Sequence, residues 1–204
     1  MHTGSVARVI AGEAGGRRLA VPDGRNTRPT SDRAREGLFA TVSSIAGPLA
    51  GSRVMDLYAG SGAVGIEALS RGAAHVLLVE SAAPALRVIR ANIEAVGLAG
   101  AEVAADRVER LLGRPPAAEP RAAIAERRYD VVFADPPYAL PAAEVTRVLE
   151  LLTKHGWLAP EALVVIERAT RDGALAWPFG YQPDRARRYG EATFWYGLAP
   201  RDLR

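Results

Sequence analysis

The 204-residue sequence contains no cysteine, and only three histidines are scattered along it. Disulfide bonds and thiolate metal sites are therefore excluded, and we expect no zinc site or other metal centre. No apolar run approaches the ~20 residues that a membrane-spanning helix needs, and no signal peptide is visible. These absences predict a soluble cytoplasmic protein with no membrane partner.

Lysine is almost absent as well. Lys154 is the single lysine among 26 basic residues, so arginine carries nearly all the positive charge. The net charge is +3, and residues 1–37 hold this whole surplus, with seven arginines and four acidic residues. Arginine makes forked hydrogen bonds to phosphate and stacks on bases. The N-terminal segment is therefore a candidate surface for nucleic acid.

The motif Asp135-Pro136-Pro137-Tyr138 follows an apolar run, residues 129–134, that is typical of a buried strand. The two prolines stop this strand and hold an acidic side chain and free carbonyl groups rigidly at its carboxyl end. Ligands bind at this end of strands in open α/β sheets. The hydrogen-bond acceptors could bind the N–H groups of an amino group, and the tyrosine ring could stack on the planar heterocycle that carries it. A plain turn is the alternative, because Asp-Pro and Pro-Pro are common turn sequences.

A second candidate site follows a predicted strand that ends near Tyr58. Glycines 60, 62 and 65 fit the G-x-G-x-x-G pattern of dinucleotide-binding loops, and a helix begins near Ala63. Glu80 ends the next strand, about 20 residues beyond the first glycine, where an acid accepts hydrogen bonds from ribose hydroxyls. Glycine spacing alone is weak evidence, but strand, turn, helix, strand and acid in this order indicate a site for an adenosine-containing ligand.

The carboxylate of Asp56, four residues before Gly60, bears on which adenosine ligand binds. A dinucleotide places its pyrophosphate at the helix N-terminus, where this carboxylate would repel it. A cation suits the position better, such as the ammonium and sulfonium of S-adenosylmethionine. The alternative is that Asp56 is a buried acid that holds backbone amides of the loop. Asp106, after the short strand 101–105, is a candidate acceptor for the adenine amino group and equally a candidate helix N-cap.

Hydrophobic periodicity predicts alternating strands and helices along most of the chain. The expected strands are 54–58, 75–79, 101–105, 129–134 and 162–167; the expected helices are 31–45, one from 63, 82–96 and 142–155; hairpins are expected over 6–21 and 181–198. This order predicts a doubly wound α/β fold, with a mostly parallel sheet, an antiparallel C-terminal hairpin, and an N-terminal β-hairpin and helix. We expect a basic hairpin extension over residues 1–30 and the main domain over 31–204.

In order and spacing, the Asp56 loop, Glu80, Asp106 and the Asp135 motif resemble the Rossmann-like S-adenosylmethionine-dependent amino-methyltransferases. Residues 27–39, Thr-Arg-Pro-Thr-Ser-Asp-Arg-Ala-Arg-Glu-Gly-Leu-Phe, are similar to the signature of the RsmD-type family, which methylates the exocyclic N2 amine of a guanine in bacterial 16S ribosomal RNA. The resemblance runs from about residue 6 to residue 198. Residues 113–128 depart from it and are interpreted as a variable surface loop without assigned function.

The resemblance implies S-adenosylmethionine as cofactor and 16S ribosomal RNA as partner, either free or within a 30S subunit or assembly intermediate. It also implies a monomeric enzyme that catalyses direct methyl transfer. The expected catalytic residues are Asp135, Pro136, Pro137 and Tyr138. The expected cofactor-binding residues are Asp56, Tyr58, Ala59, Gly60, Ser61, Gly62, Glu80, Ser81, Asp106, Arg107 and Asp135. The expected RNA-binding residues are Arg8, Arg17, Arg18, Arg28, Arg33 and Arg35.

Two other classes of function stay open. One is a different amino-methyltransferase, acting on adenine N6 of DNA or on a glutamine amide of a protein, because the Asp135 motif fits any planar amine. The other is a NAD-binding oxidoreductase that uses the literal glycine pattern. The oxidoreductase alternative leaves Asp56 and the Asp135 motif without a role, and it offers no clear hydride-transfer residues.

Overall fold

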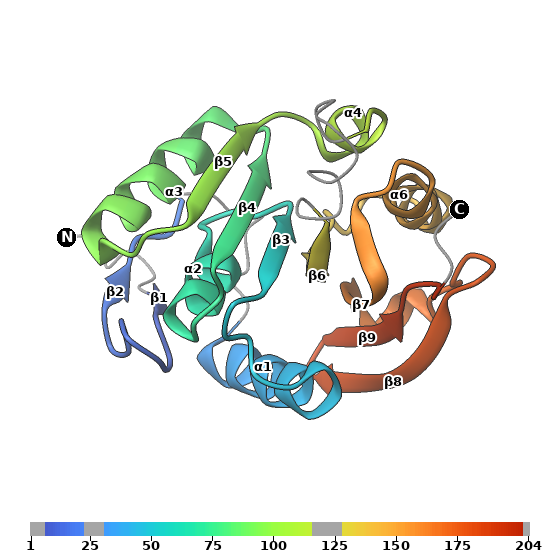
Figure 1. The fold of residues 1–204 in the computed structure, drawn as a ribbon, viewed down its shortest axis with the longest axis horizontal. Coiled ribbons are helices and arrows are strands. Elements are labelled where there is room, and N and C mark those ends of the chain that lie inside the picture. Colours follow the sequence, from blue (N-terminus) through green and yellow to red (C-terminus); the bar gives the residue numbers. More distant parts are fainter. Residues whose placement is uncertain (1–6, 23–30, 116–127, 202–204) are drawn as a thin grey trace. The chain divides into compact units, whose positions relative to one another are not determined.

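A computed structural model describes residues 7–22, 31–115 and 128–201. Contacts between residues divide the chain into two compact units, Met1–Asp106 and Arg107–Arg204. Strands and helices alternate along most of the chain, between a pair of consecutive strands near each end (Figure 1). The boundary predicted between residues 30 and 31 stays a prediction. No helix in the three described ranges is long and apolar enough to cross a membrane.

The first unit contains a parallel sheet in the order β5-β4-β3. Its elements are β1 (Ala7–Arg8), β2 (Arg18–Leu19), α1 (Asp32–Ala46), β3 (Arg53–Leu57), α2 (Ala63–Ser70), β4 (His75–Glu80), α3 (Ala83–Val96) and β5 (Ala101–Ala105). Leu57 is paired with Val79, and Val79 with Ala104. The three strands therefore end at one edge of the sheet, and the residues that follow them lie along this edge.

The second unit combines parallel and antiparallel pairing. Its elements are α4 (Val108–Leu112), β6 (Tyr129–Ala134), α6 (Ala142–Lys154), β7 (Leu158–Ala169), η1 (Thr170–Asp172), β8 (Gln182–Tyr189) and β9 (Ala192–Leu198). Strands β6 and β7 are parallel, whereas β9 lies antiparallel between β7 and β8. The mostly parallel sheet with an antiparallel C-terminal hairpin, predicted from the sequence, is confirmed.

The N-terminal hairpin is part of the first unit's core. Ala7, Val9, Ala14 and Leu19 are buried in one cluster with Ala63 and Ile66 of α2 and Val96 of α3. The hairpin strands are only two residues long, and an isolated two-stranded hairpin of this size is marginally stable in water. Its stability therefore comes from packing against the two helices.

Most predicted elements are confirmed, and one strand is longer than predicted. Strand β7 begins at Leu158, before Pro160 and Glu161, which are typical turn residues. Glu161 has a φ of 58°, and the pairing of β6 with β7 shifts register between Tyr129 and Val131. The added length therefore crosses an irregularity that hides the strand pattern in the sequence.

Candidate functional site

The glycine loop between β3 and α2 has a backbone conformation that few residue types adopt. Gly60 and Gly62 have φ values of 57° and 76°, and Tyr58 has a φ of 60°. A tyrosine in the left-handed region carries conformational strain, which is a common feature of ligand-binding loops. The loop is closed by hydrogen bonds from Ala59 N to Val79 O and from Gly62 N to Ala59 O, at 3.0 and 2.7 Å.

Two glycines of this loop allow α2 to lie close to β4. A Cβ atom on Gly62 would lie 2.9 Å from Leu78 Cδ2, and one on Gly65 would lie 2.9 Å from Leu78 Cδ2 and from Val76 Cγ1. A side chain at either position would force the buried side chains of β4, or the helix itself, to shift. The third glycine of the pattern thus serves helix–strand packing, as it does in other nucleotide-binding loops.

Asp56 lies on β3, almost fully buried, beneath the start of α2. Its Oδ2 atom accepts a hydrogen bond from Gly65 N at 2.8 Å, so it satisfies one of the free amides of the helix N-terminus. The pKa of Asp56 is raised to about 7, chiefly by burial; the Gly65 hydrogen bond opposes this rise, and the negative charge of Glu80 adds to it. The sequence left two roles open for Asp56. The structure shows one of them, in which the carboxyl group accepts a hydrogen bond from a backbone amide of the loop and helix start. A role beside a cofactor cation stays a prediction.

Glu80 ends β4 and joins two segments of the same edge. Its Oε2 atom accepts from Gly60 N at 3.0 Å, and Oε1 accepts from Ser81 N and Ala82 N at 2.7 and 2.8 Å. The carboxylate therefore bridges the glycine loop and the start of α3. A ribose hydroxyl at this position would meet a charged acceptor that the backbone holds in place.

Asp106 and Arg107 follow β5 at the boundary of the two units. The N-cap of α4 is Arg107 and not Asp106, so the N-cap alternative for Asp106 is wrong. The Nε atom of Arg107 lies 3.7 Å from Glu109 Oε2, and the Arg107 side chain is largely exposed. The proposed adenine contact of Asp106 stays a prediction.

The sequence did not predict a role for Asn92 of α3, whose side chain holds the glycine loop in place. Its side chain is buried, and Nδ2 donates to Ser61 O and to Ala20 O, both at 2.9 Å. Its Oδ1 atom accepts from Ala20 N at 2.8 Å. One amide side chain thus links the loop to the chain segment that leaves the N-terminal hairpin.

The Asp135 motif lies in the second unit, directly after β6. Asp135, Pro137 and Tyr138 are exposed and Pro136 is buried; Tyr138 has 45% of its surface exposed. Leu140 N donates to Pro137 O at 2.8 Å, so the motif forms a short turn before α6. The motif therefore presents an acidic side chain and an aromatic ring to solvent at the carboxyl end of a buried strand.

The hairpin is fastened to α2 by buried polar groups. Glu67 is fully buried, and its carboxylate accepts from Ile10 N at 2.6 Å and from Ala11 N at 3.1 Å. Ser70 Oγ donates to Ala11 O and accepts from Ala14 N. These bonds satisfy the amides of the hairpin turn, which would be costly to leave unpaired.

The predicted RNA-binding arginines have different surroundings. Arg8 and Arg18 are exposed, and Arg8 pairs with Asp32 at 2.9 Å. Arg17 is exposed too, but its guanidinium donates to the last carbonyl groups of α3, at Ala95 and Val96. Arg33 is exposed on α1 as predicted, and Arg28 lies outside the described residues.

Arg35, which was predicted to bind RNA, is buried in the structure described. Its side chain is 1% exposed, and the guanidinium donates to Arg8 O and to Asp32 Oδ1. Burial lowers the pKa of Arg35, and the charges of Asp32 and Glu67 oppose this effect. Arg35 therefore joins the hairpin to α1, and its guanidinium is not exposed to a phosphate in this structure.

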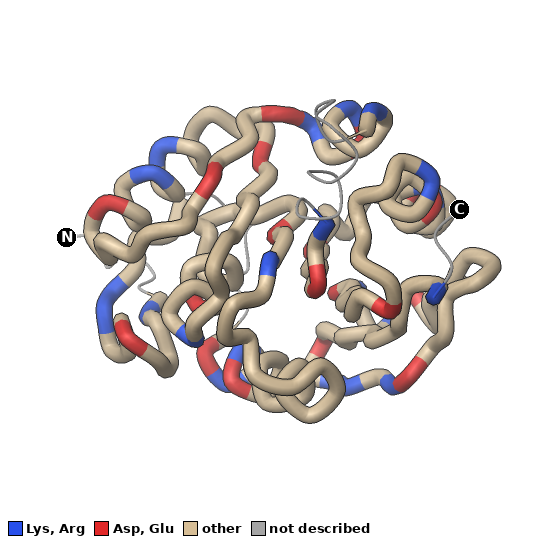
Figure 2. Tube along the Cα trace, in the orientation of Figure 1, with Lys and Arg blue, Asp and Glu red and all other residues tan. Residues whose placement is uncertain are grey.

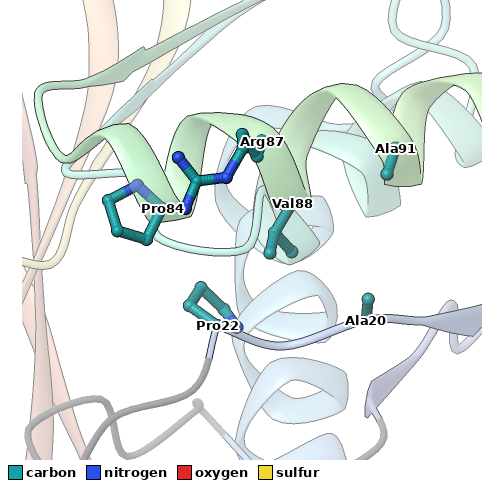
Figure 3. A pocket seen from close by; sticks show the side chains of 6 residues that line it. All are labelled: Ala20, Pro22, Pro84, Arg87, Val88 and Ala91. Atoms are coloured by element: carbon teal, nitrogen blue, oxygen red, sulfur yellow. The ribbon is translucent and has the colours of Figure 1, made fainter.

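A shallow pocket of about 350 Å³ lies between the exit of the hairpin and the exposed face of α3 (Figure 3). Its lining is Ala20, Pro22, Pro84, Arg87, Val88 and Ala91. None of the predicted site residues is among these lining residues. The pocket is mostly apolar, and it adjoins Asn92 through Ala91 and Ala20.

Comparison with known proteins shows the family. Residues 7–197 match the model of the family described as Conserved hypothetical protein 95. The chain is 32% identical over 197 residues to ribosomal RNA small subunit methyltransferase D of Escherichia coli K12, with 95% of this chain and 90% of that protein covered. The chain therefore belongs to the family of ribosomal RNA small subunit methyltransferase D. It is also 35% identical to the putative rRNA methyltransferase YlbH of Bacillus subtilis, over 78% of this chain and 81% of that protein.

Solved structures agree with the family. A putative methyltransferase from Escherichia coli superposes with a TM-score of 0.81 at 28% identity, covering 97% of this chain and all of that one. A hypothetical protein from Thermus thermophilus superposes with a TM-score of 0.73 at 33% identity, covering 96% and 99% of the two chains. The Rossmann-like methyltransferase fold expected from the sequence is confirmed.

Proposed function

We propose that the protein transfers a methyl group from S-adenosylmethionine to the N2 amine of a guanine in small-subunit ribosomal RNA. The observation that carries this proposal is the relationship, over nearly the whole chain, to ribosomal RNA small subunit methyltransferase D. The family signature in residues 27–39 supports the same substrate class, and the Asp135 motif supports methyl transfer to a planar amine. The local chemistry of the two units bears on the cofactor and on the reaction.

The edge of the first unit fits a cationic adenosine ligand better than a dinucleotide. Asp56, Glu80 and Asp106 lie in or directly after three neighbouring parallel strands. The amide of Gly65 at the start of α2 already donates to Asp56, so it is not available to a pyrophosphate. A sulfonium and an ammonium are favoured where carboxylates gather. Glu80 would bind the ribose hydroxyls, and Tyr58 to Gly62 would lie against the methionine part.

Bound S-adenosylmethionine supplies an electrophilic methyl group. The guanine N2 amine is a poor nucleophile because its lone pair is delocalised into the ring. Asp135 and the carbonyl group of Pro136 would accept the two amine hydrogens, favour a pyramidal nitrogen and stabilise its growing positive charge. Tyr138 would stack on the base. The N–C bond forms as the S–C bond breaks, S-adenosylhomocysteine leaves, and one amine proton is lost to Asp135 or to water.

The exocyclic amine must reach this motif, so the target guanine has to be unpaired or flipped out of a helix. Positioning of the amine and electrostatic stabilisation would then provide most of the rate acceleration. The exposure of Asp135 and Tyr138 supports this role, because both side chains can meet a base that arrives from solvent.

The proposal is tested by methyl transfer from tritiated S-adenosylmethionine. The acceptors are naked 16S RNA and 30S particles from a strain that lacks the gene, together with DNA and release-factor protein as competing substrate classes. We expect label in the RNA, in a nucleoside that co-migrates with N2-methylguanosine. Label in DNA or protein alone would overturn the proposal. Calorimetry separates the oxidoreductase alternative, because S-adenosylhomocysteine should bind and NAD should not.

A further inference from the structure

Strand β8 ends at the same edge of the second unit as the Asp135 motif. Ala134 of β6 is paired with Ile166 of β7, Ile166 with Trp195 of β9, and Trp195 with Ala186 of β8. Two antiparallel steps separate β7 from β8, so β8 runs in the same direction as β6. Arg187 and Arg188 therefore follow Ala186 towards the edge at which Asp135 follows Ala134.

The distance along this edge suits a short stretch of nucleic acid. Neighbouring strands lie 4.7–4.9 Å apart, so three steps from β6 to β8 span about 14 Å. A stacked strand advances ~3.4 Å per nucleotide, and about four nucleotides would cover this span. A strand whose target base lies at Asp135 would therefore bring its flanking phosphates to the end of β8.

The end of β8 is basic and open to solvent. Figure 2 shows basic positions following one another along β8, and nearly the whole strand is exposed. Arg187 makes no hydrogen bond or ion pair with any residue in the described ranges. Arg188 donates through Nε to Gly190 O at 3.0 Å, which leaves its terminal amino groups for a ligand. Arg171, which follows β7 at this edge, is also exposed.

Nearby acidic groups do not cancel this charge. Asp172 is paired with the buried Arg168 at 2.9 Å, and Asp184 with Arg185, which lies on the side of Arg187 remote from the edge. Of the other acids at this edge, Glu167 is buried near the end of β7, and Glu191 lies in the turn between β8 and β9, beside three exposed arginines. Arginine at a sheet edge also prevents strand pairing between molecules, and the experiment below separates this role from RNA binding.

We propose that Arg171, Arg187 and Arg188 form a second RNA-binding surface, which binds the phosphates that flank the target nucleotide. This inference rests on the proposed function and adds a substrate-positioning surface in the second unit, separate from the N-terminal hairpin. The planar guanidinium groups bind phosphate through paired hydrogen bonds. The surface acts on RNA affinity and on the register of the target base, and it leaves cofactor binding unchanged.

The test compares Arg187→Ala, Arg188→Ala and the double variant with Arg201→Ala. Arg201 is exposed and pairs with Glu161 near the start of β7, so its replacement makes the same charge change at the opposite end of the strands. For each protein, 16S RNA binding is titrated at several salt concentrations, KM for RNA and kcat are measured, and S-adenosylhomocysteine affinity and thermal stability serve as controls.

We expect the double variant to raise KM for RNA, and each lost contact to flatten the log–log salt dependence by about 0.7. Melting temperature and S-adenosylhomocysteine affinity should match the wild type. A double variant with the salt slope and KM of Arg201→Ala would overturn the inference, as would a protein that only aggregates more readily. Wild-type protein that does not methylate RNA would instead refute the proposed function, so the two failures are distinguishable.

Discussion

Asn92 of α3 and Ser61 of the glycine loop are joined by a 2.9 Å hydrogen bond from Nδ2 to the carbonyl oxygen. The same side chain pairs with both backbone groups of Ala20. The candidate cofactor loop and the N-terminal hairpin therefore share one buried support. A displacement of either segment removes hydrogen bonds from the other.

Replacing Asn92 by leucine keeps the branched shape of the side chain and removes all three hydrogen bonds. We expect the free energy of unfolding to fall by about 2–4 kcal/mol, because buried backbone groups at Ala20 and Ser61 lose their partners. Urea unfolding measures this loss, and calorimetry should show weaker S-adenosylmethionine binding. Arg90→Leu on the exposed face of α3 is the control, for which we expect a change within ~0.5 kcal/mol. Equal effects of the two substitutions would contradict the role of Asn92.

The pKa of Asp56, raised to about 7 by burial, predicts a pH dependence of stability. An aspartate in the unfolded chain loses its proton near pH 4, so between about pH 4 and pH 7 the folded state binds the proton more strongly. Stability therefore falls as the pH rises through this window. Asp56→Asn should remove this contribution, on the order of 2–4 kcal/mol at pH 8. Urea midpoints of both proteins at pH 5 and pH 8 measure the difference.

Asp56→Asn also decides between the two roles considered for this residue. If Asp56 faces the sulfonium of the cofactor, the variant loses more affinity for S-adenosylmethionine than for S-adenosylhomocysteine, whose sulfur is a neutral thioether. If Asp56 only holds the Gly65 amide, both affinities change by the same factor. The ratio of the two dissociation constants is the measurement, and the wild-type ratio is the control.

Glu80→Ala should weaken S-adenosylmethionine binding by about 1.5–3 kcal/mol, because a charged acceptor for the ribose is lost. Stability should fall too, since the carboxylate accepts from the amides of Gly60, Ser81 and Ala82. Glu80→Gln keeps one acceptor oxygen and is the matched control for the charge. Affinity that stays unchanged in a folded Glu80→Ala protein would remove this residue from the cofactor site.

Asp135→Ala should abolish most turnover and keep S-adenosylhomocysteine affinity within about tenfold, or roughly 1.4 kcal/mol. Asp135 is exposed at the end of β6, so its loss leaves no cavity in the core. Single-turnover methylation of 16S RNA is the measurement, with calorimetry as the control for cofactor binding. Near-normal single-turnover rates would refute the catalytic role.

Arg18 and Arg35 should respond in opposite ways to replacement by alanine. Arg18 is exposed, and its loss should flatten the salt dependence of RNA binding by about 0.7–0.9 without changing stability. Arg35 is buried and bonded to Arg8 O and Asp32, so its loss should lower the melting temperature. Salt titrations and thermal melts on both variants give the comparison. An unchanged slope in Arg18→Ala would identify this side chain as ordinary solvated surface.

Local signals predicted much of the fold. Ser31 begins the range expected for the first helix, and in the structure it is the N-cap of α1, where its Oγ atom accepts from Ala34 N at 3.2 Å. Gly97 follows the range expected for the helix over 82–96, and in the structure it ends α3 with a φ of 68°. Each signal depends on residues within a turn of one another, which is why the sequence alone reveals it.

The supports of the candidate site were not predicted, because they join residues far apart in the chain. Asn92 contacts positions 72 and 31 residues away, and Glu67 reaches amides 57 and 56 residues away. For Arg35, the sequence did contain a signal of burial, namely its spacing from apolar residues of the same helix. Arg35 lies three residues before Leu38 and seven before Val42, on the face of α1 that is buried. Its positive charge favoured the prediction of an RNA contact, whereas the structure buries the side chain.

The short hairpin strands have a consequence for protein engineering. Glu67, Ser70, Asn92 and Arg35 each supply a polar contact that the hairpin cannot make within itself. An N-terminal segment transplanted alone from a relative would therefore lack the helix side chains that form hydrogen bonds with its backbone. Functional chimeras of this family should exchange the hairpin and helices α1 to α3 together, as one continuous segment.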